Sequence, residues 1–213
     1  MKTQSKRSFK GIIALPCIFF FLLSIQTLQA QVAYKLSASK DNVVKVLGSS
    51  NVHDWTMIAQ KPVCEAEFGA LSGEVPKKLG SLSFSVEAKN LKSEHESMDG
   101  RTYKTIKADT YPRIVFKLNS ATITPGQKDN FIIQATGSLT IAGVSQVITM
   151  QVSGLVNPDK TITCTGQQKL KLTDYKIDPP SFMLGAMKVK NDLTIQFSLN
   201  LVKTETNKIT ATN

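Results

Sequence analysis

The 213-residue sequence is poor in the side chains that most often build metal or catalytic centres. It has two histidines, His53 and His95, and three cysteines, none of them at the short spacings that mark zinc sites. No Gly-x-Ser-x-Gly motif occurs, and no cysteine–histidine pair has a distinctive context. The sequence therefore predicts no metal site, no cofactor and no enzyme activity.

Long apolar runs are missing too, except near the N-terminus. Four basic residues precede the apolar run 11–25, and a more polar stretch ends at the small residue Ala30. Because a spanning helix needs about 20 apolar residues, we interpret residues 1–30 as a secretory signal peptide. An uncleaved anchor is the alternative; Cys17 lies in the wrong context for a lipoprotein cysteine. The signal predicts an exported protein, periplasmic or secreted.

The positive charge is modest once this segment is set aside. The chain carries 26 Lys and Arg against 16 Asp and Glu, a formal net charge of +10. Four of these cations lie in residues 1–30, which leaves 22 against 16, or +6. That balance is ordinary for an exported protein and does not predict nucleic-acid binding. The remaining length suits one domain.

Two cysteines remain in the exported chain, Cys64 and Cys164. Each falls on the apolar phase of a predicted strand. An oxidising compartment permits a disulfide between them, and buried free thiols are the alternative. The sequence leaves both open, since it does not show whether the two Cα atoms are close.

Internal repeats and low-complexity segments are absent, and alternation of apolar and polar residues fills the chain instead. In residues 130–154, Phe131, Ile133, Ala135 and Leu139 alternate with polar neighbours, then Gly143 offers a turn, and the alternation resumes. This pattern predicts a long hairpin with one buried face. Similar alternation recurs over residues 34–38, 44–50, 63–74, 80–91, 114–119, 161–172 and 192–202.

The period changes once, over residues 94–108. Ser93 and Glu96 have the spacing of a capping box, and the helix must end before Pro112. The sequence thus predicts one short helix among eight or so antiparallel strands. A two-sheet sandwich and a closed barrel both fit, but long amphipathic strands make poor exposed edges, and closure removes edges. We therefore expect an all-β, roughly eight-stranded antiparallel barrel.

Three segments carry a resemblance to a known family. Residues 98–120 contain Tyr111-Pro112-x-Ile114-x-Phe116, residues 137–150 contain a Gly-x-Leu-Thr-Ile-x-Gly-Val hairpin, and residues 171–199 contain a loop and a last strand. Together they resemble the YceI family, exported polyisoprenoid-binding proteins with a lipocalin-like barrel. The text around His53 resembles a variant of this family, although Ser145 stands where threonine is common and the usual pattern around the early histidine is missing.

The resemblance covers roughly residues 34–202 and implies a YceI-like β-barrel domain over 31–203, followed by a polar tail over 204–213. It implies a non-catalytic protein that holds an isoprenoid, such as a polyprenyl phosphate or a quinone tail, in an apolar tunnel. The alternating pattern agrees, because its inward set is apolar and poor in charge. The expected lining residues are Phe68, Phe84, Phe116, Leu118, Phe131, Leu139, Phe197 and Leu199.

Five further residues are candidates for a headgroup or rim site. His53, Asp54 and Trp55 either pack and hydrogen bond at the rim of the barrel or bind a headgroup. Arg101 and Lys104 either bind a phosphate, if the helix caps the mouth, or form a solvated helix face.

The sequence also leaves two other functions open. One is a structural or stress-related interaction protein whose barrel core is filled. The other is an integral outer-membrane barrel, which the many polar residues on the outward phase oppose. Membrane proximity, a homodimer and the identity of the lipid are not determined by the sequence.

Overall fold

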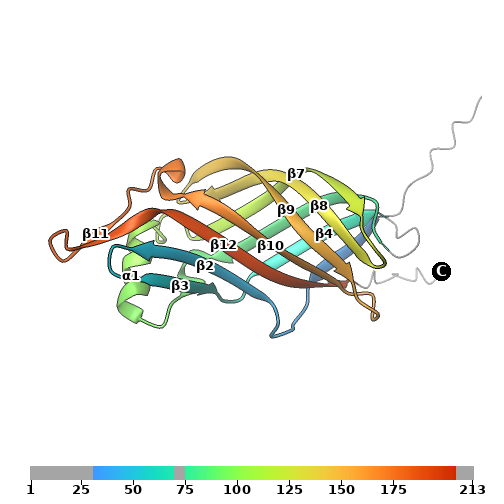
Figure 1. Ribbon diagram of the computed structural model, residues 1–213, viewed down its shortest axis with the longest axis horizontal. Coiled ribbons are helices and arrows are strands. Elements are labelled where there is room, and N and C mark those ends of the chain that lie inside the picture. Colours follow the sequence, from blue (N-terminus) through green and yellow to red (C-terminus); the bar gives the residue numbers. More distant parts are fainter. Residues whose placement is uncertain (1–30, 70–74, 205–213) are drawn as a thin grey trace, which may run out of the picture.

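The computed structural model describes residues 31–69 and 75–204. The interpreted signal peptide, the end of the strand expected over 63–74 and nearly all of the expected tail lie outside these residues. One sheet closes on itself (Figure 1). Its antiparallel strands follow one another as β1 (Gln31–Leu36), β4 (Val63–Gly69), β5 (Leu79–Glu87), β7 (Arg113–Pro125), β8 (Asn130–Ile141), β9 (Val144–Val156), β10 (Ile162–Lys171) and β12 (Met187–Lys203).

Closure comes from the last strand. β12 is 17 residues long, and its C-terminal end pairs with β1 at Leu36↔Leu201. Earlier in β12, residues 189–198 pair instead with β2 (Val43–Ser50), which continues through β3 (Asp54–Ala59) to β6 (Leu91–Lys92). The expected eight-stranded antiparallel barrel is thus confirmed, and β2, β3 and β6 form an additional wall at one end.

The end of the barrel with this additional wall also carries the helix. α1 spans Glu96–Thr105, and η2 (Leu172–Tyr175) and the short strand β11 (Ser181–Phe182) lie at the same end (Figure 1). α1 is too short to cross a membrane, and the described residues contain no longer apolar helix.

The predicted capping box is wrong. The N-cap is His95, with no side-chain cap hydrogen bond, and Ser93 lies outside the helix. The backbone N–H and hydroxyl of Ser93 donate to Oδ1 of Asp99 at 2.7 and 2.8 Å. Asp99 is the buried acidic residue of α1, and it takes the backbone N–H of Ser93 that a capping box would have directed to Glu96.

The opposite end of the barrel is closed by packed side chains. Phe68, Phe131, Ile162 and Leu201 are all at most 1% exposed there. Cross-strand pairs such as Ile162↔Leu201 and Ile162↔Val156 bring them together from separate parts of the chain. The barrel therefore has a sealed end and an end covered by α1.

The hairpin between β8 and β9 turns as predicted. Ala142 and Gly143 form its two-residue loop, with φ angles of 50° and 78°. Two consecutive positive φ values match the twist of a tight hairpin. An added Cβ on Gly143 would also lie 2.4 Å from the ring of Tyr111. Both the positive φ and the lack of space therefore require glycine at this position.

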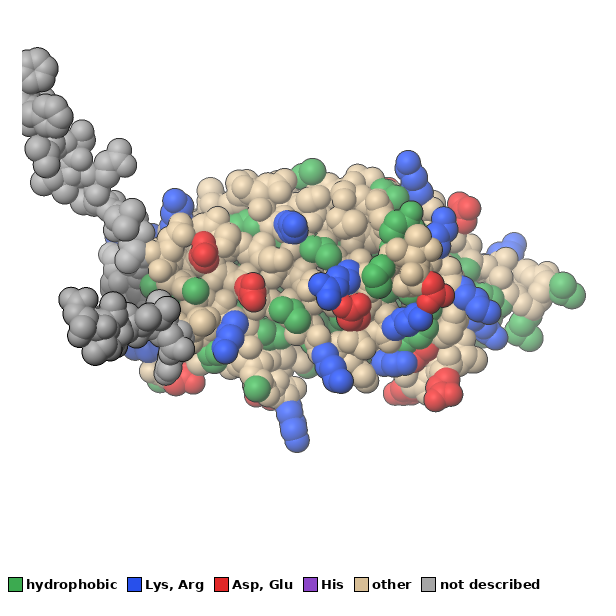
Figure 2. Space-filling model, turned by 180° about the vertical axis from the view of Figure 1, so that it is seen from behind, with side chains coloured by type: hydrophobic (Ala, Val, Ile, Leu, Met, Phe, Trp, Pro, Cys, Tyr) green, Lys and Arg blue, Asp and Glu red, His purple; other side chains and the backbone are tan. Residues whose placement is uncertain are grey.

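The outer surface of the barrel is polar. Outward positions on the strands carry Lys35, Glu65, Glu67, Lys117 and Lys169, all exposed. Charged side chains are spread along the length of the face in Figure 2, with only scattered apolar ones between them. An outer-membrane barrel needs an apolar band, so this surface argues against that alternative.

Candidate functional site

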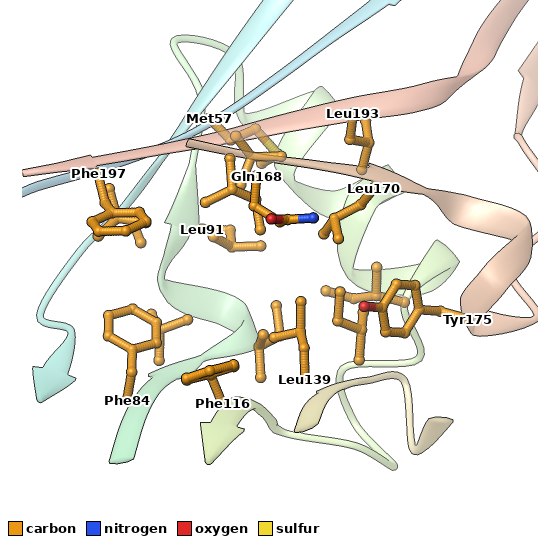
Figure 3. A pocket seen from close by; sticks show the side chains of 18 of the residues that line it. Met57, Phe84, Leu91, Phe116, Leu139, Gln168, Leu170, Tyr175, Leu193 and Phe197 are labelled. Carbon is orange, nitrogen blue, oxygen red and sulfur yellow. The ribbon is translucent and has the colours of Figure 1, made fainter. Parts of the chain in front are cut away.

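An apolar cavity of about 380 Å³ runs along the inside of the barrel. Its lining reaches from Met98 of α1 to Phe68 and Leu201 at the sealed end. Cavities that hold small ligands usually measure about 300–1,000 Å³, so the volume suits one guest molecule. Figure 3 shows side chains from several strands converging on this space.

Several inward side chains are not fully buried. Phe84, Leu118, Ile195 and Phe197 lie on the inward phase of β5, β7 and β12 and line the cavity, yet each is of intermediate exposure. Because they line the cavity, they leave accessible area facing it. The middle of the barrel is therefore hollow and not a packed core.

Most of the lining expected from the sequence faces this cavity. Phe68, Phe84, Phe116, Leu118, Leu139, Phe197 and Leu199 all line it. Phe131 is not among the lining residues, and its expected position needs correction. Its ring packs on Gly154, where an added Cβ would lie 2.3 Å away, so Phe131 helps to seal the barrel.

Alternation alone missed lining residues that come from turns and short segments. Tyr175 belongs to η2, Ile177 and Pro180 to the loop after it, and Phe182 to β11. None of these segments has a strand period, so nothing local indicated which side chains turn inward. The family resemblance included this loop, which was the available signal.

The polar part of the lining gathers beside α1. Ser50 ends β2, His53 precedes β3, Arg101 and Thr102 belong to α1, and Lys171 ends β10. Arg101 lies over the ring of Phe182, with its Cζ atom 4.8 Å from the ring centroid, a cation–π contact. This end of the cavity thus combines positive charge with apolar surface.

Of the five rim candidates, the structure brings three to the cavity. His53, Trp55 and Arg101 line it, whereas Asp54 and Lys104 are exposed and are not among the lining residues. Asp54 follows the outward phase of β3, opposite to its neighbour Trp55. Whether His53, Trp55 or Arg101 binds a headgroup stays a prediction.

α1 is fixed over the cavity by specific contacts. The hydroxyl of Tyr103 lies 2.8 Å from the carbonyl oxygens of both Lys89 and Leu91 and shares its one hydrogen between them. Burial on its own raises the pKa of Asp99, but hydrogen bonds from Ser93 and Lys92 outweigh it and hold that pKa below its usual value. The helix is therefore anchored by an ionised, buried carboxylate.

The two cysteines both line the cavity and are free thiols in the structure. Burial raises the pKa of each to about 12, and proximity to Cys64 contributes for Cys164. Cys64 and Cys164 thus face the same interior, and no disulfide joins them in the structure. Thiols this strongly protonated are poor nucleophiles and poor metal ligands.

No metal centre is evident in the part of the chain that the structure describes. Residues 31–69 and 75–204 contain no group of three or more His, Cys, Asp or Glu side chains placed to hold an ion. The chemistry that this cavity can perform is shape and apolar complementarity, with a few hydrogen-bonding groups at its edge.

Comparisons with known proteins agree with the fold. A family model described as the YceI-like domain matches residues 34–201. BcnA of Burkholderia cenocepacia is 17% identical, with a TM-score of 0.61 over 75% of this chain and 95% of that one. A polyisoprenoid-binding domain from Saccharophagus degradans is 13% identical, with a TM-score of 0.62 over 81% and 99% of the two chains.

A third similar structure is the YceI protein of Campylobacter jejuni. It is 17% identical, with a TM-score of 0.54 over 70% of this chain and 84% of that one. The comparison with curated proteins finds no match to the present chain. At these identities, the solved structures establish the barrel fold alone.

Proposed function

The chain belongs to the YceI-like family, and from this premise we propose that it binds and carries a long apolar lipid, of the isoprenoid or quinone type, without catalysing a reaction. The observation that carries this proposal is the hollow interior, where Phe84 and Ile195 expose apolar area to the cavity. The Saccharophagus degradans domain, which is described as polyisoprenoid-binding, supports the same class of ligand.

The physical basis is removal of apolar surface from water. Burial contributes about 25 cal/mol per Å², so a guest that buries ~200 Å² of hydrocarbon gains ~5 kcal/mol. An unbranched or isoprenoid chain needs no catalytic group and few directional contacts to obtain this energy. The positively charged end beside Arg101 and Lys171 suits a polar or anionic headgroup.

The setting that we propose is the periplasm or the extracellular side, after cleavage of residues 1–30. The same proposal brings the end with α1 close to a lipid surface. Met183 and Leu184, in the β11–β12 hairpin, are the most exposed large apolar side chains of the described chain. Asn51 ties this hairpin to the β2–β3 turn through hydrogen bonds with Ala186 and Lys188.

Vesicle binding tests the lipid-surface part. The Met183→Ser/Leu184→Ser variant should sediment less with phosphatidylglycerol vesicles than wild type does. Leu155→Ser is the matched control, because Leu155 is also exposed but lies next to the end of β9, at the sealed end. Equal sedimentation of all three proteins would remove the hairpin from the proposal.

The carriage itself is tested by native mass spectrometry of protein purified without detergent, followed by lipid extraction. We expect a mass above that of the polypeptide and an isoprenoid or other long-chain lipid in the extract. Bare polypeptide that also fails to take up added polyprenols would favour the structural alternative, in which the barrel serves as a scaffold for protein contacts.

A further inference from the structure

Two buried polar groups beside the cavity lack hydrogen-bond partners. They are the hydroxyl of Tyr175 and Nε1 of Trp55, for which no partner is present among the described residues. Tyr175 is 2% exposed, and both residues line the cavity. An unpaired buried donor is costly, so each such group in a native protein calls for an explanation, and a missing ligand is one.

Tyr175 points into the cavity. In Figure 3 its ring enters from η2 and its hydroxyl is directed toward Leu139 and Leu170; the oxygen itself is buried, so a guest contacts it once the neighbouring side chains shift. A second polar side chain, the carboxamide of Gln168, lies among Met57, Leu91 and Leu193; its Nε2 donates one hydrogen to the carbonyl oxygen of Lys169 at 3.0 Å, which leaves its second N–H. Gln168 follows the inward phase of β10, between Cys164 and Leu170, where the other side chains are apolar or absent.

The position of Tyr175 is fixed from both sides. Gln146 of β9 donates to the carbonyl oxygen of Asp174 at 2.6 Å. The N–H of Thr173 donates to Oδ1 of Asn191 on β12 at 3.0 Å, and Nδ2 of Asn191 donates to the Thr173 hydroxyl at 2.9 Å. η2 is therefore held between two strands of the barrel, and the hydroxyl keeps its aim without bonding to the protein.

We propose that the carried lipid has an uncharged oxygen, a carbonyl, ether or hydroxyl, that accepts a hydrogen bond from Tyr175 and lies within reach of the Gln168 amide. This proposal rests on lipid carriage and names the chemistry of the guest at one point along the cavity. Tyr175 and Gln168 are both neutral, and a charged group buried without a counter-charge is strongly disfavoured.

Charge elsewhere in the lining agrees with a neutral partner here. The cationic lining residues Arg101 and Lys171 belong to α1 and to the end of β10, and no described Asp or Glu lines the cavity. Burial, together with the neighbouring Asp174 carboxylate, raises the pKa of Tyr175 to about 12, so its hydroxyl remains a donor at neutral pH.

The test compares two guests that differ by one oxygen. Delipidated protein is incubated with equal amounts of heptadecane and 2-heptadecanone, separated by gel filtration and extracted, and the retained ratio is measured by mass spectrometry. Wild type should prefer the ketone, and Tyr175→Phe should lower the ketone-to-alkane ratio about three- to tenfold, the value of one hydrogen bond. Gln168→Leu should lower it as well.

Tyr34→Phe is the matched control. Tyr34 is equally buried, packs edge-on against Phe68 at 5.4 Å, and is not among the lining residues. The Tyr34→Phe variant should retain the two guests in the same ketone-to-alkane ratio as wild type. An unchanged ratio in Tyr175→Phe overturns the polar contact while lipid carriage stands, whereas failure of wild type to retain either guest overturns both.

Stability gives a second readout. Because the Tyr175 hydroxyl has no partner in the empty protein, delipidated Tyr175→Phe should melt at the same temperature as wild type or higher. A lower melting temperature would show that the hydroxyl serves the fold and would overturn the assignment.

Discussion

The ring of Phe131 on β8 lies over Gly154 on β9, its direct partner in the antiparallel register. A Cβ atom at position 154 would come within 2.3 Å of two ring carbons. An aromatic ring packed on a cross-strand glycine covers backbone that would otherwise be exposed in the interior. This pair helps to close the sealed end of the barrel.

Gly154→Ala should therefore destabilise the protein. The ring of Phe131 is 1% exposed and has little room to move, so the added methyl group overpacks the sealed end. We expect a loss of about 1–3 kcal/mol in the free energy of unfolding, or ~2–12 °C in melting temperature. Gly100→Ala is the control: an added Cβ on this helical glycine meets nothing within 4 Å, and alanine favours a helix. Equal melting temperatures for the two variants would contradict the packing argument.

The same pair shows what periodicity predicts and what it does not. Alternation placed Phe131 on the inward face correctly, because the side-chain period of a strand is a local property. It did not distinguish a residue that lines the cavity from one that seals its end. That difference depends on Gly154, 23 positions later, and on the pairing of β1 with β12, which no local pattern contains.

The helix shows a second limit. The change of period and the proline boundary predicted α1, but its start depends on Asp99, whose hydrogen bonds with Ser93 keep Ser93 from capping the helix. Tyr175 shows a third limit of prediction from sequence, because its orientation follows from hydrogen bonds between η2 and two distant strands. The fold was thus largely predictable from period and family resemblance, whereas the polar details of the cavity required the structure.

A tryptophan placed inside the cavity should block lipid binding. Ile195 of β12 lines the cavity and exposes part of its side chain to it, so Ile195→Trp occupies the space of the guest. We expect purified Ile195→Trp to contain at least tenfold less lipid than wild type, with a melting temperature changed by only a few degrees, because the ring fills a void. Gln196→Trp carries the same ring on the outward phase and should retain lipid normally. Normal lipid content in Ile195→Trp would show that the guest lies elsewhere.

The buried thiols predict a loss of stability at alkaline pH. The pKa of Cys64 and of Cys164 is about 12 in the folded protein, against 9.0 for an ordinary thiol. The folded state therefore holds these protons more tightly, so the stabilisation is complete below pH 9 and is lost as pH rises toward 12. Each thiol contributes a decrease of at most ~1.4 kcal/mol per pH unit in this window. Thermal unfolding at pH 8 and pH 10 checks the effect.

Cys164→Ala separates this effect from general alkaline unfolding. Between pH 8 and pH 10, the stability of the variant should fall by roughly half as much as that of wild type, because one of the two titrating thiols is gone. Alkylation with iodoacetamide gives an independent check: in the folded protein both thiols should resist labelling, and both should react after denaturation without a reductant. A requirement for reductant would mean that the two cysteines form a disulfide.

The carboxylate of Asp99 should control how firmly α1 covers the cavity. It accepts two hydrogen bonds from Ser93 and lies 3.5 Å from Nζ of Lys92. Asp99→Asn keeps the shape but removes the charge, so at pH 7 we expect a loss of about 1.5–3 kcal/mol, the value of hydrogen bonds to a charged group. Urea unfolding measures the loss, and faster transfer of bound lipid to vesicles should accompany it.

The pH dependence of the Asp99 contribution has the opposite sign to that of the thiols. Since the folded pKa of Asp99 lies below the ordinary 3.8, its stabilisation is complete above that value and disappears as pH falls through the folded pKa. The difference between wild type and Asp99→Asn should therefore be constant from pH 5 to 7 and shrink below pH 4. Asp109→Asn serves as the control, because Asp109 is highly exposed and its ion pair with Lys89 should contribute little. If Asp99→Asn and Asp109→Asn transfer lipid at the same rate, the carboxylate does not hold the helix over the cavity.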